Sequence, residues 1–133
     1  MIVGVADTHA ALWYMFSDVR LSAGATAFIR GAAKQGEKIA VSTISLAEIV
    51  FLVEKKRIPA NAYDELLQTL HDPEHVFDEA VVESAIIDAM RRVPRADVPD
   101  MPDRIIAATA YYLNVPVISR DDLIRASNVQ TVW

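Results

Sequence analysis

The chain has 133 residues, a length that fits one domain with a sizeable buried core. It is 53% hydrophobic with only 4 Gly and 6 Pro, which excludes a disordered chain. It has no cysteine, which excludes disulfides and thiolate metal sites, so a bound metal would have oxygen or imidazole ligands, and these favour Mg²⁺ or Mn²⁺. The net charge of -5 excludes a generally basic surface for nucleic acid, which would need local basic patches or a bridging cation.

The apolar runs of the sequence are short. "IVGVA" is followed by Asp7 and "IIAATAYYL" by Asn114, so neither is long enough to span a bilayer. The first residues also lack the charged stretch and the cleavage pattern of a secretory signal. We therefore expect a single domain over residues 1–133 that is cytoplasmic and has no membrane partner.

Strands and helices are predicted to alternate in the first half of the chain. "MIVGVA" predicts a buried strand that ends at Asp7, and "THAALWYMF" a helix directly after it. A second helix begins at a Ser22 cap and stops near Gly36. "KIAVS" predicts the next strand, and "ISLAEIVFLVEKK" a helix with a basic carboxyl end that Pro59 terminates.

The second half continues the alternation. A leucine-rich stripe predicts a helix around Leu66, "EHVFD" a short strand, and the stripe from Val82 to Ala89 another helix. After the Pro-rich loop "RRVPRADVPDMP", the sequence predicts a helix that ends at Leu113, the strand "VPVIS", a short helix from Asp121 and the strand "VQTVW". Strands separated by helices imply an α/β fold with a central parallel sheet flanked by helices.

Acidic residues follow the predicted strands. Asp7 comes directly after the first strand, Glu48 lies about one turn into the helix after the second, and Asp121 follows "VPVIS". Asp100 and Asp103 open the preceding helix. Because the carboxyl ends of parallel strands share one edge, these groups can meet in the crevice where ligands usually bind.

Helix capping is the alternative explanation for each of these acids. Asp7, Asp100 and either Asp121 or Asp122 are suitable N-caps, and Ser45–Glu48 has the spacing of a capping box. A cap, however, requires only one polar residue per helix, and Ser or Asn serves as well as Asp. Here acids recur at the starts of three helices and inside a fourth, which favours a shared site.

Electrostatics gives a second argument for a metal. Four carboxylates within several Å of one another repel, and their pKa values rise unless a cation neutralises them. Arg104 and Arg120 are the only basic sequence neighbours of these acids. A divalent cation such as Mg²⁺ takes oxygen ligands and can bridge to a phosphate, so hydrolysis of a phosphodiester is chemically possible at such a site.

The sequence resembles the PIN domain, and within it the VapC-like toxins of toxin–antitoxin pairs. The resemblance covers nearly the whole chain in family order and rests on "VADTHAALW", "VSTISLAEIVFLVEKKRI", "DMPDRIIAATAYYLNVPVISRDDLI" and the "TVW" end. It implies a three-layer α/β/α PIN-like domain and an endoribonuclease that cuts RNA with a metal-activated water. It also implies binding of Mg²⁺ or Mn²⁺, a cognate VapB-like antitoxin as inhibitor, and a homodimer.

The resemblance also assigns the site residues. The four acidic places of the family, catalytic and metal-binding, fall on Asp7, Glu48, Asp103 and Asp121, with Asp100 as an accessory acid of the metal site. Thr8 and Ser119 match small hydroxyl residues that often flank the pocket. Met101 replaces a proline often found in this motif, and Asp122 duplicates Asp121, so the alignment alone selects between the two.

Two other functions stay open. The pocket could belong to a catalytically silent PIN-like binding module that receives arginines from a partner. It could also serve a Mg²⁺-dependent phosphatase with Asp7 as nucleophile, although His9 stands where that class has a second Asp. The helix-end basic residues are interpreted mainly as solvated, with RNA contact as the alternative. Trp13, Tyr14 and Phe16 are interpreted as residues that pack in the core or in a dimer, with stacking on bases as the alternative.

Overall fold

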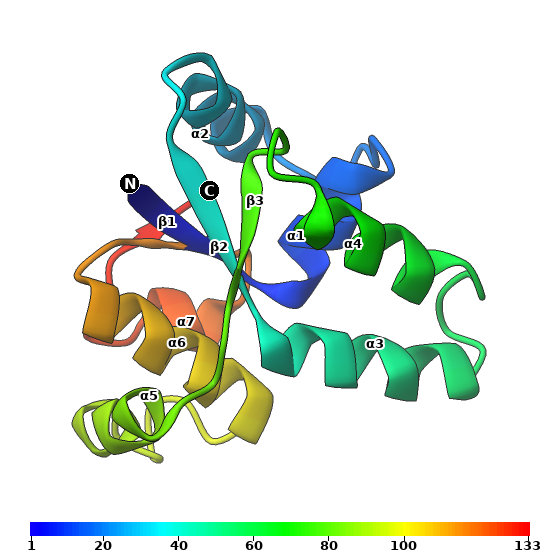
Figure 1. The fold of residues 1–133 in the computed structure, drawn as a ribbon. Helices are drawn as coiled ribbons and strands as arrows, with labels where there is room; N and C mark the ends of the chain where they lie inside the picture. The colour runs from blue at the N-terminus through cyan, green and yellow to red at the C-terminus, as the bar shows by residue number, and fades with distance from the viewer.

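A five-stranded parallel sheet forms the centre of the computed structural model, which describes residues 1–133 (Figure 1). The strand order is β3-β2-β1-β4-β5, and every neighbouring pair is parallel. The strands are β1 (Ile2–Ala6), β2 (Lys38–Ser42), β3 (Phe77–Ala80), β4 (Val117–Ile118) and β5 (Thr131–Val132). The predicted α/β class with a central parallel sheet is confirmed.

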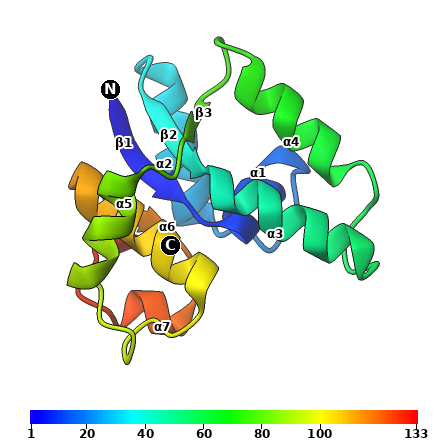
Figure 2. The ribbon, with the colours of Figure 1, turned by 60° about the horizontal axis from the view of Figure 1, so that its bottom comes forward.

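Helices cover both faces of this sheet, as Figures 1 and 2 show. They are α1 (Thr8–Met15), α2 (Ala23–Lys34), α3 (Thr43–Glu54), α4 (Ala62–His71), α5 (Ser84–Ala89), α6 (Met101–Leu113) and α7 (Asp122–Arg125), with a 3-10 turn, η1 (Met90–Arg92), after α5. Helices α3 and α4 run side by side away from the sheet, whereas α5, α6 and α7 gather on its other side. None of these helices has the length and apolar character needed to cross a membrane.

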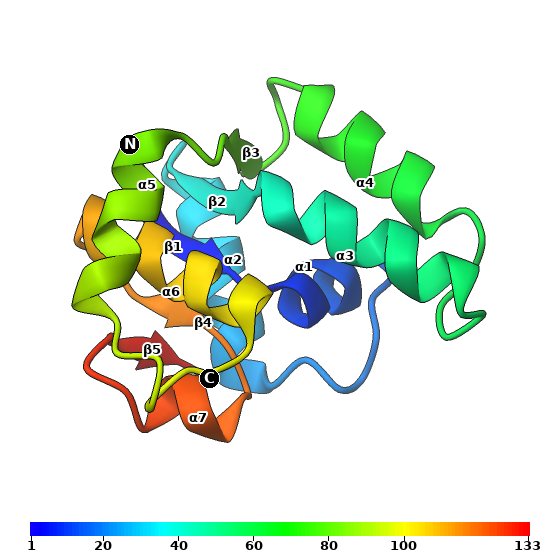
Figure 3. The same ribbon diagram turned by 90° about the horizontal axis from the view of Figure 1, so that it is seen from below.

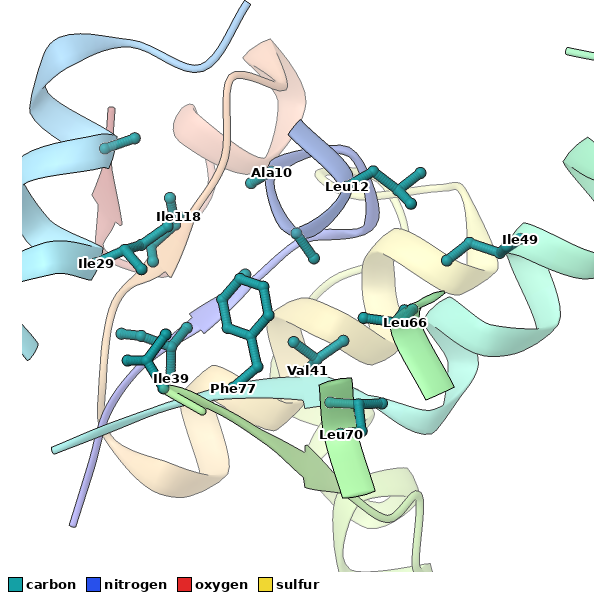
Figure 4. Packing of buried hydrophobic residues seen from close by; sticks show 14 of the residues in the cluster. Ala10, Leu12, Ile29, Ile39, Val41, Ile49, Leu66, Leu70, Phe77 and Ile118 are labelled. Atoms are coloured by element: carbon teal, nitrogen blue, oxygen red, sulfur yellow. The ribbon is translucent and has the colours of Figure 1, made fainter. Parts of the chain in front are cut away.

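The alternation of side chains along the strands divides the core in two. In β1, Val5 packs with α5 and α6, while Ala6 packs with α1, α2 and α4. In β2, Ala40 lies on the same side as Val5, and Val41 lies on the same side as Ala6. Figure 4 shows the α4 side of the core, with the Phe77 ring near Ile39 and Val41. Because both faces of the strands are buried, their sequences are continuous apolar runs and do not alternate between apolar and polar residues.

The path of the chain creates a topological switch point beside β1. From β1 the chain moves outward to β2 and β3, then returns across the sheet to β4 and continues to β5. The connections after β1 and after β4 therefore diverge to opposite sides, which leaves a crevice at the carboxyl ends of these two strands.

Several element boundaries differ from the sequence prediction, and β4 and β5 are each shorter than the strands predicted from "VPVIS" and "VQTVW". The predicted strand "EHVFD" is displaced, because Asp72 and His75 accept the backbone N–H groups of Glu74 and Phe77 and hold this stretch in a turn, so β3 begins only at Phe77. The helix striped from Val82 begins at Ser84. Helix α3 ends at Glu54, two residues before the end of the predicted segment "ISLAEIVFLVEKK", through a backbone cap in which Lys56 adopts a φ of 57°.

Candidate active site

A pocket of about 430 Å³ lies at the switch point and contains all five acids that the sequence singled out. Its lining residues are Asp7, Thr8, His9, Trp13, Arg20, Glu48, Asp100, Asp103, Arg120 and Asp121. Helix α3 contacts both α1 and α6, and Figure 3 shows these three helices from below. The fold thus brings together acids that lie up to 114 positions apart in the printed sequence, from Asp7 to Asp121.

Asp7 is the most deeply buried of these acids, with 9% of its surface exposed. Its Oδ1 accepts the N–H of Ala10 at 2.8 Å and caps α1, and its Oδ2 accepts the hydroxyl of Ser119 at 2.6 Å. Burial raises the pKa of the Asp7 carboxyl, and the hydrogen bonds from Ser119 and Ala10 oppose that rise. These two hydrogen bonds therefore fix the orientation of the Asp7 carboxylate.

Glu48 is held by two buried hydroxyl groups. Thr8 Oγ1 donates to Glu48 Oε1 at 2.5 Å and lies 2.8 Å from Ser45 Oγ. Because Thr8 gives its only hydroxyl proton to Glu48, Ser45 donates to Thr8. Burial raises the pKa of Glu48, and the charge of Asp100 adds to that rise. The predicted capping box is wrong, because α3 is capped by Ser42 and Ser45 lies inside the helix.

Asp100 and Asp103 have different surroundings, although they lie three residues apart. Asp100 is exposed and caps α6 by accepting the N–H of Asp103 at 3.1 Å. Asp103 lies in the first turn of that helix and is half-buried in the pocket. Burial, followed by the charges of Asp100, Asp121, Glu48 and Asp7, raises the pKa of Asp103 to about 7. Asp103 thus combines burial with repulsion from the other four acids of the pocket.

Asp121 and not Asp122 lines the pocket. Asp121 Oδ1 accepts the N–H groups of Leu123 and Ile124 and caps α7, while its own N–H donates to Ser119 Oγ at 3.0 Å. Ser119 is fully buried and thus joins Asp7 at the end of β1 to Asp121 beyond the end of β4. Asp122 is exposed in the first turn of α7.

Only one of the two basic residues that the sequence suggested lines the pocket. Arg104 turns away, because its guanidinium donates to the carbonyls of Met90 and Val93. Arg120 lines the pocket, and so does Arg20, which lies in the loop after α1 and which no sequence pattern indicated. An Arg in a loop carries no periodicity signal, so only the fold reveals its position.

The aromatic residues of α1 have separate environments. Trp13 is buried, as expected for packing, and it also forms part of the pocket wall. Tyr14 packs against Phe77 with ring centroids 5.4 Å apart. Phe16, in contrast, is 41% exposed at the end of the helix, so it is not a core residue, and packing of Phe16 in a dimer stays a prediction.

The donor set of the pocket suits a hard divalent cation. It holds five carboxylates, and neither of its arginines forms an ion pair with any of them. No three of these side chains lie close enough together to bind one ion directly. Mg²⁺ commonly takes only one or two protein carboxylates and keeps several waters, so the spacing of the pocket fits an ion held partly through water.

Comparison with known proteins places the chain among nucleases. The sequence model of the PIN domain matches residues 5–127. The chain belongs to the PIN-domain family. This PIN domain is 31% identical to ribonuclease VapC22 of Mycobacterium tuberculosis in an alignment of 137 positions that covers 100% of both chains. It is therefore a relative of the VapC toxins, a family of nucleases that is typically metal-dependent.

Solved structures share the fold. A chain of the VapBC2 complex of Rickettsia felis, bound to a DNA fragment from its promoter, matches the PIN domain with a TM-score of 0.69 and 16% identity, over 98% of this chain and 97% of that one. A chain of a toxin–antitoxin complex from Klebsiella pneumoniae matches with a TM-score of 0.62 and 19% identity, over 98% and 96%. The three-layer arrangement is thus that of chains in toxin–antitoxin complexes.

Proposed function

We propose that this PIN domain is a VapC-like endoribonuclease that hydrolyses phosphodiester bonds of RNA. One observation carries the proposal: in a chain related to ribonuclease VapC22 along its whole length, five carboxylates surround a single open pocket without a paired cation. A pocket of this charge repels a polyanion unless a metal ion is bound. The fold relationship and the electrostatics therefore support the same activity.

The metal would be Mg²⁺ or Mn²⁺, held by a set of carboxylates drawn from Asp7, Glu48, Asp100, Asp103 and Asp121. Such an ion, when bound, lowers the pKa of water and stabilises the charge that develops on an attacked phosphate. Asp7 and Glu48 are suited to holding it, because hydroxyl groups of Ser119 and Thr8 fix their carboxylates. Asp103 binds a proton near neutral pH in the free pocket and would lose it on metal binding.

We further propose that the protein is the toxin of a toxin–antitoxin pair, with a VapB-like antitoxin as its inhibitor, and that it acts as a homodimer in the cytoplasm. The chains with the same fold in complexes from Rickettsia felis and Klebsiella pneumoniae support the antitoxin partner. Co-expression with the product of a small neighbouring gene, followed by co-purification and an RNA cleavage assay, tests this proposal. Absence of any inhibitory partner would favour a solitary nuclease.

The nuclease proposal is tested by two isosteric substitutions, Asp7→Asn and Asp103→Asn. Each removes one negative charge while leaving an oxygen that can accept a hydrogen bond, so the fold should persist and RNA cleavage in Mn²⁺ or Mg²⁺ should fall roughly a hundredfold or more. The matched control is Asp122→Asn, which makes the same change next to Asp121 but outside the pocket.

The controls also separate the alternatives. Excess EDTA should abolish cleavage by the native chain, and circular dichroism should show that all three variants are folded. Full activity of both pocket variants, or full activity in EDTA, contradicts the proposal. RNA that stays intact during long incubation of the native chain with Mn²⁺ would indicate a silent binding module instead.

A further inference from the structure

Two arginines from distant parts of the chain stack on one tryptophan at the wall of the pocket. The guanidinium carbon of Arg120 lies 4.5 Å from the centroid of the Trp13 ring, and that of Arg20 lies 5.0 Å from it. Arg20 belongs to the loop after α1, and Arg120 precedes α7. Both also line the pocket of carboxylates. The fold thus places a pair of cations, oriented by one aromatic surface, directly beside the acids.

The tryptophan beneath them is held firmly. Trp13 is only 6% exposed, its ring makes an edge contact with Trp133 at a centroid distance of 6.0 Å, and His9 packs against it at 5.5 Å. A guanidinium stacked on an aromatic face loses little further conformational freedom when it binds a ligand. The two arginines are therefore preorganised, although both are exposed to solvent.

Neither arginine neutralises the pocket. Arg20 pairs with Asp18 through Nε at 3.0 Å and one Nη at 2.7 Å, which leaves its other Nη free. Arg120 forms no ion pair, and its guanidinium donates no hydrogen bond within the chain. The charges that act on the pKa of Asp103 are all carboxylates. The whole guanidinium of Arg120 and the second Nη of Arg20 thus remain available to an external anion.

We infer that Arg20 and Arg120 are substrate-binding residues. They hold backbone phosphates of the RNA strand that neighbour the phosphate cleaved at the carboxylates. The inference rests on the proposed ribonuclease function. A strand of phosphates that approaches five carboxylates needs fixed positive charge near the reacting position, and the planar fork of Arg matches phosphate oxygens. Stacking on Trp13 sets the direction of both forks, so the pair aligns the strand across α1 and toward the pocket.

The test compares Arg20→Ala and Arg120→Ala with a matched control, Arg91→Ala. Arg91 also pairs with an exposed aspartate, Asp88, but it lies on η1 outside the pocket and stacks on no ring. We expect each pocket variant to raise the KM for single-stranded RNA about tenfold with kcat changed less than about threefold, because a charge-assisted phosphate contact is lost. Arg91→Ala should match the native chain.

A second measurement does not depend on cleavage. In the Asp103→Asn background, the affinity for fluorescent single-stranded RNA in Mg²⁺ should fall as the salt concentration rises. Each arginine-to-alanine change should reduce the slope of log Kd against log salt by about one unit. Arg20→Lys and Arg120→Lys keep the charge without the fork, so they should keep the slope and recover only part of the affinity.

These measurements distinguish the inference from the function on which it rests. If the native chain cleaves RNA but KM and salt slope of both alanine variants equal those of Arg91→Ala, the inference is overturned and the nuclease stands. If the native chain cleaves no RNA, the proposed function fails. If an alanine variant unfolds, the lysine variant at the same position replaces it in the test. A KM of that lysine variant equal to the KM of the native chain would exclude a role for the guanidinium fork.

Discussion

The same aspartates cap helices and line the candidate site in this PIN domain, although the sequence alone left these two roles as alternatives. Asp7 caps α1 with Oδ1 and accepts the Ser119 hydroxyl with Oδ2. Asp100 and Asp121 each cap a helix through one carboxylate oxygen and still line the pocket. An Asn could perform the capping but not supply the charge. Substitution to Asn therefore separates the two roles at each position.

The raised pKa of Asp103 predicts how stability depends on pH in the absence of metal. With a folded-state pKa of about 7 against 3.8, the folded state keeps a proton that the unfolded state loses, so the free energy of unfolding falls as pH rises through this interval. Asp103→Asn removes the part of this pH dependence that Asp103 causes, because an amide does not ionise. We expect the variant to be more stable than the native chain by about 1–2 kcal/mol at pH 8, since water in the open pocket screens part of the shift.

Urea unfolding in EDTA at pH 4.5, 6 and 8 measures this effect. The advantage of Asp103→Asn should be small at pH 4.5 and should grow toward pH 8, whereas Asp122→Asn should show no such trend. Part of the pH dependence should persist in the variant, because burial also raises the pKa values of Asp7 and Glu48. An equal pH dependence in Asp103→Asn and the native chain would contradict the raised pKa of Asp103.

At the scale of elements, prediction from sequence succeeded where the local signal was complete. "KIAVS" is β2 residue for residue, and α2 begins after its Ser22 cap as expected, since an apolar run and a cap define these bounds locally. The edge strand β3 was displaced because the side chains of Asp72 and His75 accept backbone N–H groups and favour a turn, which the pattern of apolar residues does not indicate. The end of α3 was missed because Lys56, not glycine, adopts the left-handed conformation.

Helix α2 offers a prediction about how the carboxyl-terminal strand packs. A Cβ added to Gly24 would lie 2.9 Å from the carbonyl oxygen of Trp133, whereas one added to Gly31 meets no atom within 4 Å. Gly31 lies inside the helix, where alanine is favoured over glycine, whereas Gly24 lies in its first turn. Gly31→Ala should stabilise the fold by up to about 1 kcal/mol, and Gly24→Ala should destabilise it by about 1–2 kcal/mol.

Thermal unfolding of the two glycine variants checks this pair. The contact of Trp133 with Trp13 provides a second signal, because displacement of the carboxyl-terminal residue should change tryptophan fluorescence in Gly24→Ala but not in Gly31→Ala. Equal melting temperatures for the two variants would show that Trp133 moves aside without cost, and that the close approach of α2 to this residue does not contribute to stability.

At the scale of the whole molecule, the convergence of the acids follows from parallel topology. The expectation that Asp7, Glu48 and Asp121 share one edge required only the alternation of strands and helices, which the sequence shows clearly. The stacking of Arg20 and Arg120 on Trp13 could not be predicted in this way, because it depends on a loop path and on two tertiary contacts. Topology predicts which edge holds the site but not the side chains that complete it.

Divalent cations should therefore stabilise the whole fold and not only support activity. An ion that binds the folded pocket adds RT ln(1 + [L]/Kd) to the free energy of unfolding, about 2.7 kcal/mol at a hundredfold excess over Kd, which corresponds to a melting-temperature rise of roughly 10 °C for a chain of this size. Scanning calorimetry with Mn²⁺ or Mg²⁺ should show this rise in the native chain and in Asp122→Asn, and a much smaller rise in Asp7→Asn. Potassium chloride at equal ionic strength separates site binding from general screening of the net charge of -5. A rise that is as large in potassium chloride, or undiminished in Asp7→Asn, would mean that the carboxylates do not hold the ion.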